Sequence, residues 1–330
     1  MLEKVLSKLN ERLLTFGEAI REALREEMVK DERVFVMGED VRLRGITKAL
    51  WEEFGDERII NTPIAESAFT GAGLGAAITG MRPIVYHSRC DFTLYAMDSI
   101  VNQATKWTFH TGGQFKVPLV IRVGTGGYRG SGCHHSQSLE SLYMNVPGID
   151  VVMPSTPYDA KGLLKTALMM EHPAMFFEHN QLWNLEGAVP EKEYKIPFGA
   201  ADVKKEGKDV SIVTVGFMVH KALEAAKQLI EENIDVEVID LRTLIPLDKK
   251  SIVDSVKKTG RLITIEESCK TGGVGAEVAA IVVENAFDQL KASLMRIANP
   301  DAMVPYKDLN EAYILPQVDD IVETVRKIIQ

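Results

Sequence analysis

Short apolar runs alternate with amphipathic stretches along most of the chain. In the first half, the runs typical of buried strands are "VFVMGED", "RIINTP", "RPIVYHS", "VPLVIRVG", "IDVVMP" and "PAMFFEH". Helical patterns stand between them, including "TFGEAIREALREEM", which opens with a Thr15–Glu18 capping box, and the long segment "DFTLYAMDSIVNQATKW". Strands that alternate with helices in this way predict parallel sheets covered by helices.

The alternation breaks at about residues 182–200, where two prolines stand in a segment without sustained periodicity. It then resumes with the strand-like runs "DVSIVTVG", "DVEVIDLR", "RLITIEES" and "LMRIANP". Further helices are expected near 219–232, from about 248, after "GGVGAE" and from about 318. Because 330 residues exceed what one core usually supports, we expect two α/β domains, residues 1–190 and 191–330, with the linker between them.

Composition narrows the class of protein. A formal net charge of -9 argues against nucleic acid as the main partner, and no apolar run is long enough to span a bilayer. The first residues combine acids with leucines at helical spacing, which fits neither a secretory signal nor a transit peptide; these are Leu2, Leu6, Leu9 and Leu13. Three cysteines without metal-type spacing suit free thiols, so a cytoplasmic location is expected.

The stretch "NTPIAESAFTGAGLGAAITG", residues 61–80, contains a single ionisable side chain, Glu66. An acid in the first turn of a helix interacts favourably with the positive end of the helix dipole, so Glu66 has a purely structural interpretation. The helix that follows is rich in glycine and poor in solvated charges, which indicates close packing. The second interpretation is therefore a buried acid with a function.

Three other segments have polar groups suited to chemistry. The loop "GYRGSGCHHSQS" contains His134 and His135, which are either acid-base catalysts or surface residues, and their spacing does not suit zinc. Glu39 and Asp40 end a predicted strand, where they are either ligand-binding or helix-capping residues. The segment "TGGVGAEVAA" follows a strand and opens a helix, which is a weak signal for phosphate binding.

Several of these segments, with others, occur in the order of a known family: "NTPIAES" with its Gly/Ala helix, "DFTLYAMDSIVNQATKW" with "GGQF", "HHSQSLE", "PSTPYDAKGLLK", "IDLRTLIPLD" and "TGGVGAEVA". From about residue 15 to its end, the chain resembles the β subunit of the thiamine-diphosphate-dependent 2-oxo acid dehydrogenases. These are the decarboxylating components of the pyruvate, branched-chain and acetoin dehydrogenase complexes. The resemblance implies a transketolase pyrimidine-binding domain followed by a transketolase C-terminal domain.

The resemblance also assigns roles to individual residues. It implies that Glu66 hydrogen-bonds N1′ of the cofactor's aminopyrimidine and activates the cofactor. Phe92 corresponds to the aromatic residue beside the pyrimidine, Ile64 to the wall next to it, and Tyr95 to a position where some relatives have glutamine. His135, rather than His134, corresponds to the histidine that orients the substrate and protonates intermediates. Glu66 and His135 are thus the expected catalytic residues.

The chain departs from the family at two places. The resemblance places Tyr86, Arg89 and Cys90 near the cofactor edge, where relatives have other residues. The identity of the substrate therefore stays undetermined, and it need not be pyruvate. Some relatives bind potassium through backbone carbonyls at the positions of Leu119, Ala167, Leu168, Met170 and His172. The usual Asp and Asn are Met170 and His172 here, yet backbone ligation does not need those side chains.

The resemblance implies an α2β2 heterotetramer with an α subunit, in which thiamine diphosphate is shared between the two chains. Mg²⁺ is expected mainly on the α subunit, because this chain has no Gly-Asp-Gly block. The substrate would be a 2-oxo acid or acetoin, and a lipoyl-bearing acyltransferase would receive the acyl group. Two alternatives are a split transketolase-like enzyme that transfers ketol units between sugars and a non-catalytic assembly scaffold.

Overall fold

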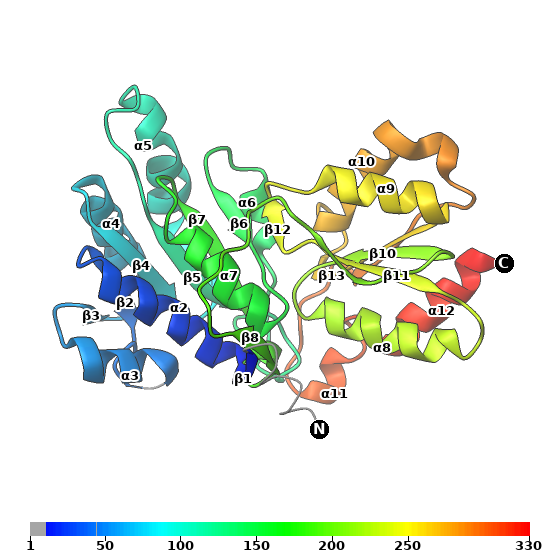
Figure 1. Ribbon diagram of the computed structural model, residues 1–330, viewed down its shortest axis with the longest axis horizontal. Helices are drawn as coiled ribbons and strands as arrows, with labels where there is room; N and C mark the ends of the chain where they lie inside the picture. Colours follow the sequence, from blue (N-terminus) through cyan, green and yellow to red (C-terminus); the bar gives the residue numbers. More distant parts are fainter. Residues whose placement is uncertain (1–10, 44) are drawn as a thin grey trace. The chain divides into compact units, whose positions relative to one another are not determined.

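The computed structural model describes residues 11–43 and 45–330, which fall into two compact units (Figure 1). Unit 1 comprises the described residues up to Thr125 together with Leu142–Phe198, and unit 2 comprises Gly126–Ser141 and Gly199–Gln330. The loop at 126–141 therefore belongs to unit 2 although unit 1 flanks it in sequence. The domain boundary between residues 190 and 191 stays a prediction.

Unit 1 is built on a parallel sheet with the strand order β6-β7-β5-β4-β2-β3. Every residue of β2, β5 and β7 is buried, as expected for strands covered on both faces. This order and direction confirm the predicted α/β architecture. The strands are β2 (Val34–Glu39), β3 (Ile59–Thr62), β4 (Arg82–His87), β5 (Val120–Thr125), β6 (Asp150–Val152) and β7 (Ala174–His179).

Helices join and cover these strands. The predicted capping box at the start of the first helix is confirmed, since Thr15 Oγ1 accepts the Glu18 amide at 3.2 Å and the Glu18 carboxylate accepts the Thr15 amide at 2.8 Å. The first and last helices of the set pack side by side (Figure 1). The helices are α2 (Phe16–Lys30), α3 (Gly45–Phe54), α4 (Glu66–Ile78), α5 (Thr105–His110), α6 (Glu140–Met144), which crosses into unit 2, and α7 (Pro157–Ala167).

The long helix expected at "DFTLYAMDSIVNQATKW" is not a uniform α-helix. It consists of the 3₁₀-helix η1 (Cys90–Ala96), the π-helix η2 (Asp98–Ala104) and then α5. In η1 the Thr93 hydroxyl donates to the Cys90 carbonyl three residues earlier at 2.5 Å and accepts from Tyr143 Oη at 2.6 Å. A side chain that takes a backbone carbonyl competes with the α-helical hydrogen bond, which explains the tighter turn.

The sequence pattern did not indicate a two-stranded antiparallel sheet formed by β1 (Glu11–Thr15) and β8 (Glu186–Pro190). β8 lies inside the segment predicted as a linker, just after the 3₁₀-helix η3 (Asn180–Leu182). Residues 1–10, which contain Leu2, Leu6 and Leu9, lie outside the described part of the chain, and Leu13 lies in β1. The pairing joins segments about 170 positions apart, so local periodicity does not reveal it.

Unit 2 has a second sheet with the order β14-β13-β10-β11-β9, in which only the edge strand β9 is antiparallel. Its strands are β9 (Asp202–Lys205), β10 (Val210–Thr214), β11 (Val236–Asp240), β13 (Leu262–Cys269) and β14 (Met295–Asn299), and a short strand β12 (Thr243–Ile245) follows β11. Its helices are α8 (Met218–Ile230), α9 (Lys249–Thr259), α10 (Val274–Ala286), η4 (Phe287–Gln289), α11 (Asp308–Glu311) and α12 (Val318–Ile329). One core packs α8 and α12 against the sheet.

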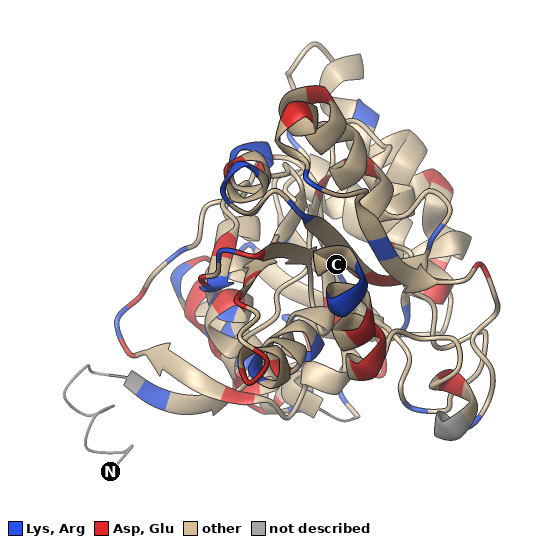
Figure 2. Cartoon of the chain, turned by 90° about the vertical axis from the view of Figure 1, so that its right-hand side faces the viewer, with Lys and Arg blue, Asp and Glu red and all other residues tan. Residues whose placement is uncertain are grey.

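The charged residues of α12 follow its helix dipole. Figure 2 shows acidic residues at the start of α12 and basic residues near the C-terminus. Asp319 and Asp320 lie in its first turn and Arg326 and Lys327 in its last, where each sign of charge is stabilising. In the part of the chain that the structure describes, no helix has both the length and the apolarity needed to cross a membrane.

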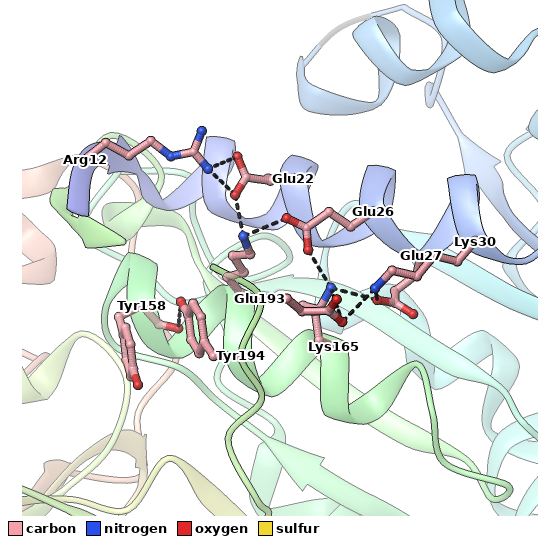
Figure 3. Close-up of polar contacts among 10 residues, drawn as sticks. Arg12, Glu22, Glu26, Glu27, Lys30, Tyr158, Lys165, Glu193 and Tyr194 are labelled. Carbon is pink, nitrogen blue, oxygen red and sulfur yellow. Dashed lines mark hydrogen bonds and ion pairs between the residues drawn. The ribbon is translucent and has the colours of Figure 1, made fainter. Parts of the chain in front are cut away.

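Helices α2 and α7 are joined by ion pairs that include two fully buried lysines (Figure 3). The Lys165 amine lies 2.5 Å from Glu26, 2.7 Å from Glu27 and 3.1 Å from Glu193. Lys161 binds Glu22 and Glu26, and Glu22 also binds Arg12. The network therefore replaces water around both amines.

The same contacts shift the pKa values of the partners. Burial raises the pKa of the Glu26 carboxyl, but hydrogen bonds from Lys161 and Lys165 outweigh burial and hold that pKa below its usual value. Burial likewise lowers the pKa of Lys165, and three carboxylates outweigh it so that the net shift is upward. The contribution of Glu26 to stability is therefore present above pH 4.5 and lost as the pH falls through its lowered pKa.

We predict that Lys165→Met lowers the free energy of unfolding by about 3 kcal/mol, because it removes the buried amine that Glu26, Glu27 and Glu193 share and leaves these carboxylates close together with fewer cations. Lys30→Met is the control, since Lys30 binds Glu27 and Glu193 at the surface and its loss should cost less than about 1 kcal/mol. Urea denaturation at about pH 7 measures both, and the difference between Lys165→Met and the native chain should shrink below about pH 4. Equal stability of the two variants at neutral pH would contradict the prediction.

Candidate active site

Glu66 is the first residue of α4, and only 8% of its surface is exposed. Ala65, the residue before it, offers no side-chain cap to the helix. Within the described ranges 11–43 and 45–330, no hydrogen bond or ion pair joins the Glu66 carboxyl to another residue. The acid thus lies at a helix N-terminus and is also buried, so its charge is balanced by the helix end rather than by a cation.

The glycines of α4 pack in different ways. Gly73 lies so close to β4 that an added Cβ would overlap with the Val85 side chain. At Gly71 an added Cβ would lie 3.5 Å from Ser99 Oγ of η2, while at Gly75 it would meet nothing within 4 Å. Gly73 therefore allows α4 to pack closely on its sheet, whereas Gly75 lies on the exposed side of the helix with no neighbour beside it in the described part of the chain.

Behind the helix, β4 contributes a buried histidine that sequence reasoning missed. His87 Nε2 lies 2.9 Å from Thr70 Oγ1, and its ring centroid lies 4.9 Å from that of Phe69. Burial lowers the pKa of His87 to about 3, so the ring is neutral at physiological pH. The signal available in the sequence was the place of His87 at the end of the predicted strand "RPIVYHS".

The predicted cofactor-binding residues Ile64, Phe92 and Tyr95 lie on two segments of unit 1. Ile64 lies two residues before the start of α4, and the other two lie on η1, which packs against α4. Ile64 and Tyr95 are 76% and 74% exposed, and Phe92 is half-buried. The structure therefore leaves two large apolar side chains uncovered on these segments.

His135 lies in unit 2, on the loop that follows β5. The Gly126 amide donates to the Gln137 carbonyl at 3.1 Å and closes the loop, and the His135 amide donates to the Gly132 carbonyl at 3.1 Å in a turn at its tip. His134 and His135 are both exposed. Because Glu66 belongs to unit 1 and His135 to unit 2, their meeting in one site stays a prediction.

The residues that depart from the family lie at the carboxyl ends of the strands in unit 1. Arg89 Nη1 donates to Asn180 Oδ1 at 2.6 Å, and Asn180 directly follows β7. Tyr86 places its ring 5.5 Å from the guanidinium carbon of Arg122, which forms a buried ion pair with Glu178 at 2.5 and 3.0 Å. Asn180 was not indicated by the sequence, although its place after a predicted strand was the available signal.

Two further polar positions have structural partners. Glu39 is buried at the end of β2, and its Oε1 accepts the Ser88 amide at 3.1 Å, so it binds the end of β4 rather than capping a helix. Cys90 is buried with its Sγ 3.5 Å from Thr125 Oγ1. Both residues tie neighbouring strand ends together.

Four of the five predicted potassium-binding carbonyls already accept hydrogen bonds. Arg82 donates to the Leu168 carbonyl at 2.8 and 3.1 Å and to the Met170 carbonyl at 2.8 Å. The Leu119 carbonyl accepts the Ala174 amide, and the Ala167 carbonyl accepts the Met170 amide. His172 lies 2.6 Å from Asp150, whose hydrogen bond raises the pKa of the imidazole. A carbonyl oxygen has a second lone pair, so the potassium ion stays a prediction.

The glycine-rich segment 271–280 holds a protein carboxylate at the start of α10. Glu266 Oε1 accepts the Gly275 amide at 2.9 Å, and a Cβ at Gly273 would overlap with Glu266 Oε2. The positive end of this helix therefore already has an anion, which argues against phosphate binding there.

Comparisons with known proteins agree with this arrangement. Residues 13–185 match the transketolase pyrimidine binding domain, and residues 199–321 match the transketolase C-terminal domain. The chain is similar to a solved structure described as a split gene transketolase, inactive beta4 tetramer, with a TM-score of 0.79 and 27% identity over 96% of this chain and 98% of that one. These matches confirm the predicted order of the two folds.

Closer relatives belong to one branch of this fold. The 2-oxoisovalerate dehydrogenase subunit beta of Bacillus subtilis is 42% identical over 96% of this chain and 98% of its own. The acetoin:2,6-dichlorophenolindophenol oxidoreductase subunit beta of Cupriavidus necator is 42% identical over 96% and 97%. The pyruvate dehydrogenase E1 component subunit beta of Porphyra purpurea is 45% identical over 94% and 96%. The chain belongs to the transketolase-like family and, within it, to the β subunits of the 2-oxo acid and acetoin dehydrogenases.

We predict opposite effects on stability for two similar substitutions in α4. Gly73→Ala should lower the free energy of unfolding by about 1–3 kcal/mol, because the new methyl group overlaps with Val85. Gly75→Ala should raise it by up to about 1 kcal/mol, because alanine favours a helix and nothing obstructs it. Thermal and urea unfolding of the chain by itself measure both. The same sign for the two substitutions would show that the packing of α4 is described wrongly.

Proposed function

We propose that the chain works in an α2β2 enzyme that oxidatively decarboxylates a 2-oxo acid or cleaves acetoin. The acyl unit passes to the lipoyl group of an acyltransferase. The observation that carries this proposal is Glu66, a buried carboxyl at a helix N-terminus with no partner among the residues that the structure describes. A buried acid of this kind fits a ligand that brings its own hydrogen-bonding nitrogen.

Thiamine diphosphate, when bound, supplies a nucleophilic carbon, C2 of its thiazolium ring. In this proposal Glu66 shares a hydrogen with N1′ of the aminopyrimidine and so controls the protonation of that ring. The position of Glu66 supports this role. Gly73 lets α4 pack closely on β4, so the first residue of the helix is held in place. The neutral His87 beneath Thr70 adds no charge to compete with it.

The apolar residues around this acid have a second role in the proposal. Phe92 would lie beside the pyrimidine, Ile64 would form the wall next to it, and Tyr95 would lie near the cofactor edge. Ile64 and Tyr95 are largely exposed in the chain alone, which supports their being covered by the cofactor and by the α subunit. Covering them would exclude water from the site.

His135 supplies the acid-base group of the proposed reaction. Its place on a loop, with an exposed side chain, supports a role in orienting the substrate and transferring protons. The diphosphate and Mg²⁺ would be held mainly by the α subunit, because the sequence has no Gly-Asp-Gly block. A potassium ion at the carbonyls of 119 and 167–172 would stiffen unit 1 without touching the substrate.

Relatives favour a dehydrogenase over the two alternatives. The relatives named as β subunits of 2-oxoisovalerate dehydrogenase, acetoin oxidoreductase and pyruvate dehydrogenase are 42–45% identical to this chain, whereas the split transketolase is 27% identical. Arg89, which could have bound sugar hydroxyls in a transketolase-like enzyme, donates to Asn180. Glu66, Phe92 and His135 are all present, which does not suit a scaffold. We place the protein in the cytoplasm, where its three free cysteines would stay reduced.

The first test of the proposal is Glu66→Gln in the enzyme reconstituted with its α subunit. Glutamine keeps the shape of the side chain but cannot share the proton, so exchange of the cofactor's C2 proton for deuterium should slow by about 100-fold or more. Glu57→Gln, at an exposed acid of the same unit, is the control and should leave the exchange unchanged. An exchange rate in Glu66→Gln equal to that of the native enzyme would rule out this role for Glu66.

The second test concerns the isolated chain, which we expect to bind thiamine diphosphate weakly and to turn over nothing. The missing contribution is that of the metal and diphosphate, whose charges provide much of the binding energy. The similar split gene transketolase is described as inactive in its beta4 form, which supports this expectation. Titration calorimetry with cofactor and Mg²⁺ measures it, and adding the α subunit should restore both binding and turnover. Tight stoichiometric binding without a partner would mean that the chain has its own diphosphate site.

A further inference from the structure

The loop that carries His135 is attached to unit 2 by a buried carboxylate. Glu267 on β13 is 5% exposed, and its Oε1 accepts the Gly127 amide at 2.5 Å. A Cβ at Gly127 would lie 2.6 Å from Leu315, 3.5 Å from Glu267 Oε1 and 3.6 Å from Glu311 Oε1. A larger residue at 127 would therefore overlap with Leu315, whereas its distances to the two carboxylates would be ordinary contacts.

A second carboxylate reaches the other end of the loop. Glu311 at the end of α11 is fully buried, and its Oε1 lies 3.5 Å from Ser136 Oγ. Ser136 directly follows His135 and is itself buried. Glu267 and Glu311 thus flank Gly127, and the loop is tied to them on both sides of its histidines.

Backbone contacts hold the outer part of the loop. The Lys307 amide donates to the Gly130 carbonyl at 3.3 Å, and Ser131 forms an isolated antiparallel bridge with Tyr306. A Cβ at Gly132 would lie 2.6 Å from the Tyr306 ring. These contacts come from the segment between β14 and α11, so they fix the tip of the loop and not its first residues.

On the side facing β13 the loop is not closely packed. A cavity of about 200 Å³ is lined by loop residues 136–139 and Cys133, by Glu267–Cys269, and by residues of the segment after β14. Side chains that border an open cavity make fewer van der Waals contacts. At the start of the loop, the hydrogen bond from the Gly127 amide to Glu267 acts together with that of the next residue, Tyr128, whose hydroxyl donates to the Pro316 carbonyl at 2.8 Å.

Two other carboxyl groups, those of Glu140 and Glu266, lie near Glu267. Burial raises the pKa of Glu140 to about 8, with Glu266 and Glu267 adding to the effect, so Glu140 is neutral at physiological pH. Glu266 is bound by the Gly275 amide at 2.9 Å and by Ser268 Oγ at 2.6 Å. Glu140 therefore adds no negative charge beside Glu267, and Glu266 has hydrogen-bond partners of its own.

We propose that Glu267 is a positioning residue for the reaction. By accepting the Gly127 amide, it fixes the loop that presents His135, with Glu311 as a second attachment. A carboxylate suits this role because hydrogen bonds to a charged acceptor are about twice as strong as those between neutral groups, and burial strengthens them further. The catalytic part of this inference rests on the proposed function of His135.

Hydrogen–deuterium exchange of the isolated chain tests the attachment without any cofactor. Glu267→Gln keeps a neutral acceptor, so exchange of the amides in 126–138 should rise about 3- to 10-fold, and Glu267→Ala should raise it further. Glu277→Ala, at an exposed acid of α10, is the matched control and should leave the loop unchanged. Exchange in β10 and α8 reports whether each variant is folded.

The conservative variant decides the outcome even where Glu267→Ala fails to fold. Loop amides in a folded Glu267→Gln that exchange at the native rate would overturn the proposal. A rise confined to 126–138 supports it.

Turnover in the reconstituted enzyme then separates this inference from the proposed function. Glu267→Gln should lower kcat about 10-fold and leave KM nearly unchanged, and it should add little to the loss caused by His135→Ala, because it acts through that histidine. A normal turnover of His135→Ala would overturn the proposed role of His135, whatever the exchange data show. If His135→Ala is impaired but Glu267→Gln turns over normally, the positioning role of Glu267 is overturned and the proposed role of His135 stands.

Discussion

A parallel strand that is covered on both faces leaves no water to receive a charge, and this constraint governs the polar residues of unit 1. The strands β2, β5 and β7 are buried along their whole length. Arg122 and Glu178, which point from neighbouring strands of that sheet, are therefore paired in a bidentate ion pair. The buried lysines of α7 are likewise surrounded by acids of α2. Each of these charges is kept in the interior because its partner lies on an adjacent element.

Glu66 is an exception to this pairing of buried charges, and the proposed function gives a reason for the exception. The carboxyl is buried at the start of α4, and no cation of the described residues accompanies it. An acid in such a place is costly to the isolated chain unless a ligand completes its hydrogen bonds. Ile64 and Tyr95 are also exposed, so two large apolar side chains remain uncovered in the isolated chain. Both features fit a chain that forms one half of a shared site.

Buried carboxylates have a different use in unit 2. Glu267 and Glu266 follow one another on β13, yet they bind different amides, those of Gly127 in a loop and Gly275 at a helix start. In both cases a glycine brings the backbone close to the acid. Strand β13 thereby connects the loop of His135 with the N-terminus of α10. The helix start that the glycine-rich motif suggested for phosphate holds Glu266 instead.

The sequence by itself determined the element order, the parallel sheets, the capping box of α2 and the unusual setting of Glu66, because periodicity, capping and composition are local properties. It also indicated the family, through motifs spread along the chain. Only the tertiary structure revealed β1 pairing with β8, Thr70 bound to His87, and Glu267 bound to Gly127, since each joins residues between 17 and about 170 positions apart. The sequence could not predict the 3₁₀ turn after β4 either, because the Thr93 hydroxyl that donates to Cys90 also accepts from Tyr143, which is 50 positions away in the sequence. Local chemistry selects the elements, whereas the partner of a buried polar group depends on which distant segment the fold places next to it.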